Sequence, residues 1–209
     1  MDLNKELFFP TPIYFFDLAN SDALNEFLKV RIYSWRDREQ AGIERSNVKR
    51  VGAWHSPTTM DVLPEFALFK NQIDTFVGMV FDDQRFDPKR PPRCQNMWAN
   101  MSPQGGYNRS HTHPGSLWSG VYYVQSPPDC GRIIFQDPRP QAHTMSVATD
   151  LDASAGFEQW PEVFHQAVAG RVILFPSWLR HEVEANLCRL SGRASDRISI
   201  SFNYTQSDG

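Results

Sequence analysis

The chain has 209 residues, of which 41% are hydrophobic and 13% aromatic, so we expect a globular protein rather than a disordered one. A net charge of -3 argues against a surface that attracts nucleic acid or an anionic membrane. The three cysteines are odd in number and lack metal-finger spacing, which predicts no disulfide framework and favours a reducing compartment.

The first residues carry neither the basic segment nor the apolar segment of a secretory signal. No window is apolar over the length that a membrane span requires. We therefore expect a soluble, cytoplasmic protein. Fifteen prolines, fifteen phenylalanines and twelve glycines favour many short strands and turns over a helical bundle.

The N-terminal part begins with an apolar, strand-like run. Residues 7–18 are rich in β-formers but contain two prolines, which is typical of an edge strand. Asn20 or Ser21 then caps a helix whose apolar residues recur at helical spacing. We expect this helix to end at the charged residues 36–39.

The region that follows contains a second expected helix. Residues 46–60 show no period and indicate a loop, in which Trp54 is either buried or lines a pocket. Proline favours the first turn of a helix, so we expect the helix to run from about Pro64 to about Asp83. The proline-rich, charged residues 85–92 then connect the helices to the second half.

The second half has the pattern of a β-protein. Strands are expected at 93–101, 117–124, 132–137, 142–147, 162–168, 171–175, 182–184 and 197–204, with a turn at 126–131 and a loop at 149–160. Short strands after two helices predict a mainly β fold, a double-stranded β-helix (jelly roll) with flanking N-terminal helices. We expect one domain over residues 1–209, with 1–92 as strand and helical support and 93–209 as the jelly-roll core.

Three histidines of this core are candidate metal ligands. His111 and His113 stand two apart before the strand at 117–124, and an extended backbone would send both imidazoles to one face. They could then share a metal at about 2.1 Å per nitrogen. His181, after the strand at 171–175, is the expected third ligand. An isolated histidine is more often structural, and we apply that interpretation to His55, His143 and His165.

A histidine and a carboxylate on one strand, with a distant histidine, form the facial triad of non-haem iron oxygenases. The second position here is His113, so three neutral imidazoles would leave the full charge on the ion and hold a dianionic 2-oxoglutarate more strongly. Alternatively, Asp137 supplies the carboxylate and one of the paired histidines is not a ligand. Asp137 equally suits a turn before a proline.

The last expected strand alternates between polar and apolar residues, and Arg197 and Ser199 share its polar face. A buried arginine is costly unless it is paired, and a carboxylate would pair it. Arg197 with Ser199 is therefore a candidate clamp for the far carboxylate of 2-oxoglutarate. The alternative is an arginine at the rim, bridged to Asp196 or Glu184.

Several segments together resemble a known family. They are the runs at 107–115, 119–124, 135–139, 170–183 and 197–203, with weaker likeness at 8–14 and 46–56. In these segments the chain is similar to the 2-oxoglutarate/Fe(II)-dependent oxygenases of bacteria and phages, distant relatives of the prolyl hydroxylases. The prolyl-hydroxylase pattern would have Asp at position 113, where this sequence has His.

The resemblance implies a double-stranded β-helix, Fe(II) held by the histidine pair and His181, and 2-oxoglutarate as a co-substrate bound by Arg197. It also implies a co-substrate pocket lined by Tyr107, Asn100 and Asn203. The predicted activity is therefore a dioxygenase that hydroxylates a substrate not written in the sequence.

Two other classes of function stay open. One is a three-histidine metalloenzyme that does not use 2-oxoglutarate, either a cupin-like dioxygenase or a zinc hydrolase. The other is a non-catalytic jelly-roll binding module. We expect a small-molecule or peptide substrate, no nucleic-acid or membrane partner, and a homodimer. Candidates to border the substrate pocket are Trp54, Trp118, Trp178 and Arg139.

Overall fold

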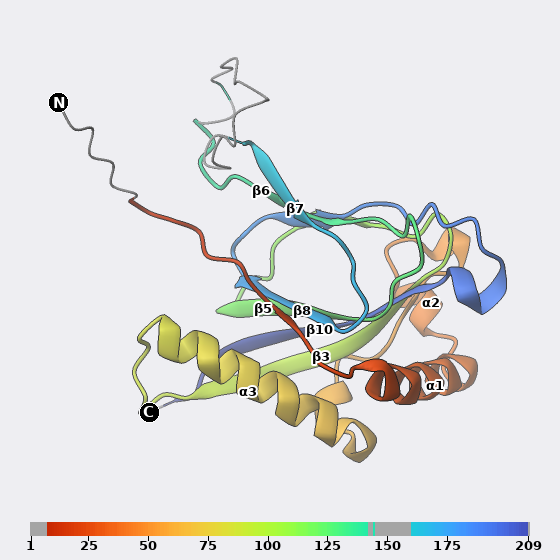
Figure 1. Ribbon diagram of the computed structural model, residues 1–209, viewed down its shortest axis with the longest axis horizontal. Coiled ribbons are helices and arrows are strands. Elements are labelled where there is room, and N and C mark those ends of the chain that lie inside the picture. Colours follow the sequence, from red (N-terminus) through yellow and green to blue (C-terminus); the bar gives the residue numbers. More distant parts are fainter. Residues whose placement is uncertain (1–7, 142–143, 145–159, 209) are drawn as a thin grey trace.

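The computed structural model describes residues 8–141, 144 and 160–208. Two antiparallel sheets face each other, and helices cover the outer face of the larger sheet (Figure 1). This arrangement is the double-stranded β-helix with N-terminal helices that the sequence predicted.

The larger sheet has six strands in the order β1-β8-β5-β10-β3-β2. Their bounds are β1 (Tyr14–Asp17), β2 (Trp54–His55), β3 (Pro92–Ser102), β5 (Trp118–Gln125), β8 (Arg171–Pro176) and β10 (Arg197–Gln206). The smaller sheet has the order β4-β9-β6-β7. Its strands are β4 (Asn108–His111), β6 (Ile133–Gln136), β7 (Glu162–His165) and β9 (His181–Val183).

The two long helices that the sequence predicted are present. They are α1 (Asp22–Arg38), with Ser21 at its N-cap, and α3 (Ala67–Asp83), which follows a short helical turn that Pro64 begins. The short helical elements of the described chain are α2 (Gly42–Arg45), η1 (Lys49–Val51), η2 (Met60–Val62), η3 (Pro64–Phe66) and η6 (Gly192–Ser195).

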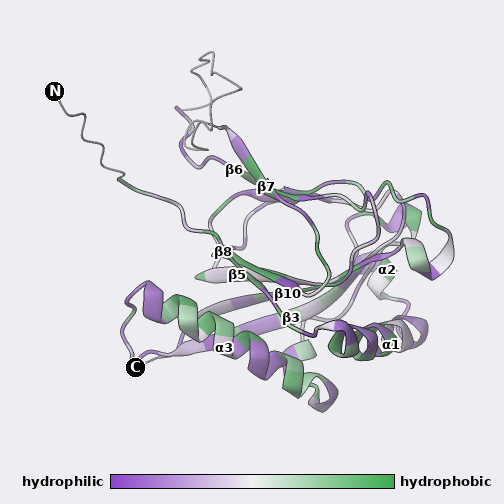
Figure 2. Ribbon diagram, in the orientation of Figure 1, coloured by the Kyte–Doolittle hydropathy of each residue, from purple (hydrophilic) through white to green (hydrophobic). Residues whose placement is uncertain are grey.

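The main hydrophobic core lies between these helices and the larger sheet. Both long helices mix hydrophobic and hydrophilic residues along their length (Figure 2), and many, although not all, of their apolar side chains are buried against the sheet. The core includes Leu28, Ile32, Phe69, Ile73 and Val77 from the helices and Ile198, Ile200 and Phe202 from β10. Burying each such side chain stabilises the fold by about 1.5–3 kcal/mol, so this face of the sheet contributes most to stability.

Some elements differ from the expectation. The expected strand over residues 7–18 forms only at β1, after both prolines, and it lies at a sheet edge as predicted. The expected loop over 46–60 contains β2, whose two residues pair with β3. The short strand β4 was not predicted, because its four residues are held by pairing with β9 rather than by local preference.

The expected strand at 142–147 and loop at 149–160 fall outside the described residues, apart from residues 144 and 160. Within the described part of the chain, no helix has the length and apolar character needed to cross a membrane.

Candidate functional site

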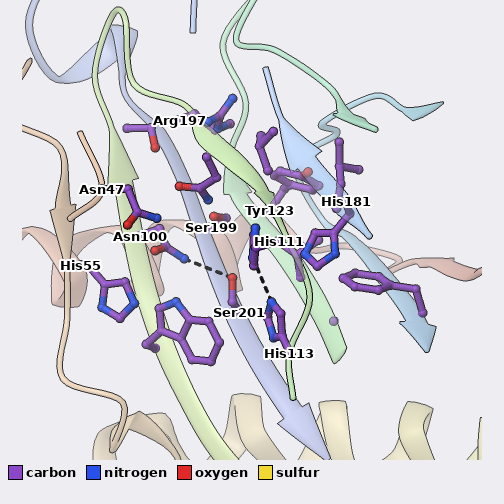
Figure 3. A pocket seen from close by; sticks show the side chains of 18 residues that line it. Asn47, His55, Asn100, His111, His113, Tyr123, His181, Arg197, Ser199 and Ser201 are labelled. Atoms are coloured by element: carbon purple, nitrogen blue, oxygen red, sulfur yellow. Dashed lines mark hydrogen bonds between the residues drawn. The ribbon is translucent and has the colours of Figure 1, made fainter. Parts of the chain in front are cut away.

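The three predicted histidines meet between the two sheets. Strand pairing sets His111, at the end of β4, opposite His181, at the start of β9. His113 lies just beyond β4, where its backbone N–H donates to the carbonyl of Ser177 at 2.9 Å. One ligand atom from each imidazole lies within 4.8 Å of the others, and the three rings turn toward a common centre (Figure 3).

Each of the three imidazoles has an oxygen acceptor at Nδ1. The contacts are His111 to the carbonyl of Arg109 at 2.7 Å, His113 to Oδ1 of Asn203 at 2.6 Å, and His181 to the carbonyl of Leu179 at 2.9 Å. An imidazole nitrogen that faces a carbonyl oxygen carries the proton, which leaves the lone pair on the other nitrogen. All three Nε2 lone pairs are therefore available at the shared centre.

The spacing of these nitrogens fits a metal ion. The Nε2 atoms of His111 and His113 are 3.0 Å apart, and two lone pairs at this distance repel unless a cation lies between them. Two nitrogen ligands at right angles, each about 2.1 Å from an ion, are about 3.0 Å apart. Burial lowers the pKa of His113, and lowers that of His181 to about 3, so both rings are neutral at pH 7.

Polar residues on the inner face of the larger sheet continue the site away from His113. Residues directly opposite in an antiparallel pair share a face, and Ser199 of β10 is opposite both Asn100 of β3 and Tyr123 of β5. Together with Arg197 and the three histidines they line a cavity of about 110 Å³. Figure 3 shows Arg197 at the end of this cavity away from His113.

Arg197 is a buried cation, with 3% of its surface exposed. Its Nη1 donates to the backbone carbonyls of Cys130 and Glu184. Gly131, with φ of +88°, makes this close approach possible, because a Cβ there would lie 2.9 Å from Nη1. The contacts hold the side chain in place but do not neutralise its charge, and burial lowers the pKa of the guanidinium.

The rim alternative for Arg197 is wrong. Asp196 accepts a hydrogen bond from Tyr33 at 3.0 Å, and the Glu184 carboxylate pairs with Arg132 at 2.6 Å. Among the described residues, no carboxylate forms an ion pair with Arg197. A buried, unpaired cation that lines a cavity favours an anionic ligand.

Tyr123 supplies a second unsatisfied group in the same cavity. Its hydroxyl is buried and has no hydrogen-bond partner within the described chain. Burial raises its pKa to about 12, so it is a neutral donor at pH 7. The neighbouring Tyr122 faces the helices instead and donates to Asn25 at 2.6 Å. A ligand with an oxygen acceptor near Arg197 would satisfy the Tyr123 hydroxyl.

Two of the residues assigned to the co-substrate pocket by resemblance lie elsewhere. Asn100 lines the cavity with Arg197 and Ser199, whereas Tyr107 and Asn203 are not among its lining residues. Asn203 lies behind His113.

Asp137, the alternative ligand, is not brought to the histidines. Its carboxylate pairs with Arg139 at 2.7 Å and accepts the backbone N–H of the same residue at 2.9 Å. Both residues line a separate hollow of about 330 Å³. In the described parts of the chain, the group of side chains placed to hold a metal comprises the three histidines and no carboxylate.

Sequence reasoning missed several residues that line the cavity: Asn47, His55, Trp98 and Tyr123. The tryptophans considered earlier are elsewhere, with Trp54 and Trp118 in the main core and Trp178 on the surface. A signal was present in residues 96–102, where Asn, Trp, Asn and Ser alternate with the buried Met97, Ala99 and Met101. That alternation marks one polar face of β3.

Solved structures of this fold include oxygenases. HygX from Streptomyces hygroscopicus, with nickel and 2-oxoglutarate bound, is similar at a TM-score of 0.59 and 13% identity, over 93% of this chain and 82% of that one. A Pseudomonas putida prolyl-4-hydroxylase is similar at a TM-score of 0.55 and 15% identity, over 93% and 92%. At these identities the likeness shows the shared fold.

A 2OG-Fe(II) oxygenase family oxidoreductase from Burkholderia pseudomallei matches at a TM-score of 0.49 and 18% identity, over 70% of this chain and 59% of that one. No curated protein matches the sequence.

The family described as "Putative 2OG-Fe(II) oxygenase" matches residues 96–203, just over half of the chain. The chain therefore belongs to this family.

Proposed function

We propose that this protein binds Fe(II) through the three Nε2 atoms and 2-oxoglutarate through Arg197, and that it hydroxylates a bound substrate. One observation carries the proposal. Three imidazoles, with every Nδ1 already engaged, open into the same cavity as a buried arginine that has no carboxylate partner within the described parts of the chain. The histidine nitrogens fit the Fe(II), and Arg197 fits the 2-oxoglutarate, that the family implies.

When bound, the iron would activate dioxygen, which is the oxidant, and 2-oxoglutarate would supply two electrons through its conversion to succinate and CO2, while the substrate C–H bond supplies the other two as it is hydroxylated. The chain does the positioning. Arg197 and the Tyr123 hydroxyl would hold and orient the far carboxylate of 2-oxoglutarate, with Ser199 beside them. Apolar residues that share the cavity, Val121, Ile133 and Phe175, would exclude water from the reacting groups.

A metal centre with three histidine ligands has one more positive charge than a centre in which a carboxylate replaces one histidine. Three neutral imidazoles leave two positive charges on Fe(II), and Arg197 adds a third, whereas 2-oxoglutarate carries two negative charges. No acidic side chain lines the cavity among the described residues. We therefore expect the dianion to bind more tightly here than it would beside a carboxylate ligand.

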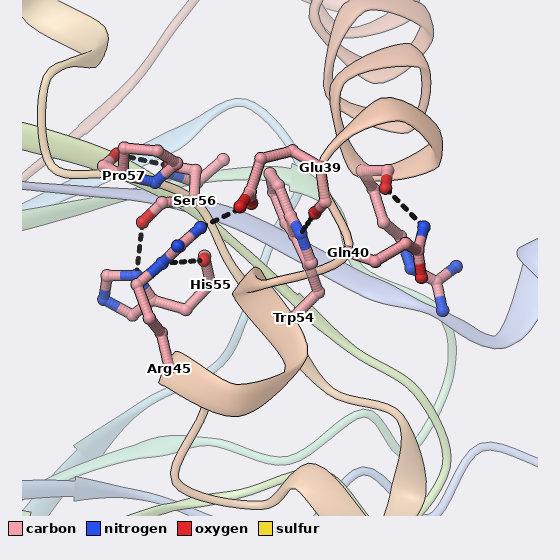
Figure 4. A network of polar contacts seen from close by, with 9 residues as sticks. Glu39, Gln40, Arg45, Trp54, His55, Ser56 and Pro57 are labelled. Atoms are coloured by element: carbon pink, nitrogen blue, oxygen red, sulfur yellow. Dashed lines mark hydrogen bonds and ion pairs between the residues drawn. The ribbon is translucent and has the colours of Figure 1, made fainter.

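We place the small-molecule or peptide substrate against the wall that the metal and 2-oxoglutarate leave free, formed by Asn47, His55 and Trp98. The His55 and Trp98 rings stack with centroids 5.5 Å apart. The backbone carbonyl of His55 accepts a hydrogen bond from Arg45 at 3.1 Å, and its Nδ1 contacts the carbonyl of Ser56 at 2.6 Å (Figure 4). The part of the wall formed by His55 and Trp98 is therefore held in position by contacts within the chain.

Turnover tests the proposal. Purified protein, reconstituted with Fe(II) and supplied with dioxygen and ascorbate, should convert 2-oxoglutarate to succinate slowly without a substrate. Arg197→Met should lower this conversion severalfold at 2-oxoglutarate concentrations that just saturate the unsubstituted protein. Iron-loaded protein that produces no succinate, with or without a panel of candidate substrates, would contradict the proposal.

A second candidate is a three-histidine metalloenzyme that does not use 2-oxoglutarate. The observation that favours it is the ligand group itself, because three histidines with an open position also suit a zinc ion and its activated water. Metal content after expression in a medium containing both metals separates the two. Zinc in the protein together with failure to bind iron would support the hydrolase.

A further inference from the structure

A buried amide lies directly behind one of the three imidazoles. Asn203 of β10 is 6% exposed, and its Oδ1 contacts Nδ1 of His113 at 2.6 Å. The same oxygen accepts a hydrogen bond from the Ser119 hydroxyl at 2.7 Å, and Nδ2 donates to Oδ1 of Asn96 at 2.8 Å. Three contacts therefore set which end of the amide faces the ring.

The network also reaches the turn before the third histidine. The hydroxyls of Ser119 and Ser177 are 2.7 Å apart, both side chains are fully buried, and the Ser177 carbonyl accepts the backbone N–H of His113. Register places Asn203 opposite Asn96 on one side and Ser119 on the other. The network thus ties β10 to the segments that carry His113 and His181.

The orientation of this amide decides whether a metal can enter. An oxygen facing the ring requires a proton on Nδ1 and leaves the Nε2 lone pair free. The opposite orientation would favour a proton on Nε2, where it would lie between His113 and His111 and block the shared centre. Metal-binding histidines are commonly held in this way by an acceptor at the other ring nitrogen.

We infer that Asn203 is a positioning residue that holds His113 as a neutral, Nδ1-protonated ligand, and that the centre is built for three imidazoles rather than for two and a carboxylate. The inference rests on the metal site of the proposed function.

An aspartate at position 113 would not suit this surrounding. One of its carboxylate oxygens would take roughly the place of Nδ1, because both atoms are bonded to the γ carbon of their side chains. It would then face the Oδ1 atom of Asn203, and two acceptors would meet in a buried network without a proton between them. The amide could turn only by breaking its contacts with Ser119 and Asn96.

The first test needs no substitution. Long-range ¹H–¹⁵N correlation spectra of metal-free protein labelled with ¹⁵N-histidine report which ring nitrogen carries each proton. We expect His113 to be protonated at Nδ1, with its signal identified by its loss in His113→Gln. A proton on Nε2 of His113 would overturn the inference.

The second test measures Fe(II) affinity by anaerobic calorimetry. Asn203→Leu removes the acceptor and should weaken Fe(II) binding about 10- to 100-fold, with loss of the Nδ1 tautomer. Asn203→Asp keeps the acceptor oxygen toward His113 but loses the hydrogen bond that Nδ2 donates to Asn96, so it should retain the Nδ1 tautomer and bind Fe(II) more tightly than Asn203→Leu. Asn25→Leu, at a buried amide that contacts Tyr122 on the opposite face of the sheet, is the matched control and should bind Fe(II) normally.

His113→Asp tests the second half of the inference. Although it restores the ligand set of the prolyl-hydroxylase pattern, it should bind Fe(II) more weakly than the unsubstituted chain. Fe(II) binding by His113→Asp that equals or exceeds that of the unsubstituted chain would overturn the claim that the centre is built for three imidazoles. Unchanged Fe(II) affinity and an unchanged His113 tautomer in Asn203→Leu would overturn the claim that Asn203 positions His113. Failure of the proposed function would give a different result. Protein that binds no Fe(II) would refute the iron enzyme, whereas the ring nitrogen that carries the proton on His113 can still be measured in the metal-free protein.

Discussion

The two faces of the larger sheet are built for different purposes. Toward α1 and α3 the strands present mainly apolar side chains, and the hydroxyls of the buried Tyr122 and Tyr204 have partners on the helices, in Asn25 and Asp74. Toward the smaller sheet, the same strands present Arg197, which has no ion pair among the described residues, and the Tyr123 hydroxyl, which has no hydrogen-bond partner there. These two groups face the cavity into which the imidazoles carried by β4, β9 and the segment after β4 converge.

The difference teaches where to look for a ligand. Consecutive residues of one strand alternate between a face that is complete and a face that is not, so the sheet is both scaffold and binding site. Buried polar groups in folded proteins normally have partners. An unsatisfied buried group that lines a cavity beside a buried cation, as the Tyr123 hydroxyl does beside Arg197, therefore indicates that the partner is a ligand. Substitutions on the helix face should change stability alone, and those on the cavity face should change binding.

The largest expected effect is at the metal ligands. His181→Ala removes one of three nitrogen donors and should weaken Fe(II) binding by at least about 100-fold, as measured by anaerobic calorimetry. His165→Ala, at a histidine of β7 whose ring packs against Phe15, should leave Fe(II) binding unchanged. Normal Fe(II) binding by His181→Ala would show that the three histidines are not the Fe(II) site.

On the helix face, Ile200→Ala should lower the free energy of unfolding by about 2–5 kcal/mol, because it opens a cavity beside the fully buried core. Urea unfolding of the metal-free protein measures it. Below the unfolding transition, Fe(II) and 2-oxoglutarate affinities should match those of the unsubstituted chain. Weaker Fe(II) or 2-oxoglutarate binding by the folded Ile200→Ala protein would contradict the claim that the helix face affects stability alone.

On the cavity face, Arg197→Met should weaken 2-oxoglutarate binding by about 2 kcal/mol or more, or about 30-fold, because the carboxylate loses its charged partner. Fe(II) affinity should not change. Arg193→Met removes an exposed arginine that pairs with Asp37 and should have no effect on 2-oxoglutarate. If both variants bound 2-oxoglutarate equally well, Arg197 would not be the clamp.

The smallest and sharpest contrast uses two adjacent tyrosines. Tyr123→Phe should weaken 2-oxoglutarate binding by about 1 kcal/mol without loss of stability in the ligand-free protein, since its hydroxyl has no partner among the residues that the structure describes. Tyr122→Phe should do the reverse, lowering stability by about 1–3 kcal/mol because Asn25 loses its donor, with no effect on 2-oxoglutarate. Identical behaviour of the two variants would contradict the comparison.

The alternation of polar and apolar residues along a strand can be predicted from the sequence. It predicted that Arg197 and Ser199 share a polar face, and it located the three histidines that the fold brings together. The equivalent alternation in residues 96–102 predicts the polar face of β3. Sequence alone could not tell which polar hydroxyl lacks a partner, because that depends on pairing between strands distant in the chain.

Asn203 shows the limit of reasoning by resemblance. It shares a face with Arg197, but six residues of extended strand span about 20 Å, so the two lie at opposite ends of the site. Asn203 contacts His113, while Arg197 lies at the far end of the cavity. Asp137 shows a different limit, since its local pairing with Arg139 keeps it from the histidines.

The central claim is that Fe(II) and 2-oxoglutarate occupy one cavity together. Anaerobic addition of 2-oxoglutarate to the Fe(II)-loaded protein tests it most directly, because iron and a bound 2-oxoacid together give a visible charge-transfer band. The band should grow to saturation at one 2-oxoglutarate per iron and be lost in His181→Ala. Iron-loaded protein that develops no such band at any 2-oxoglutarate concentration would contradict the account.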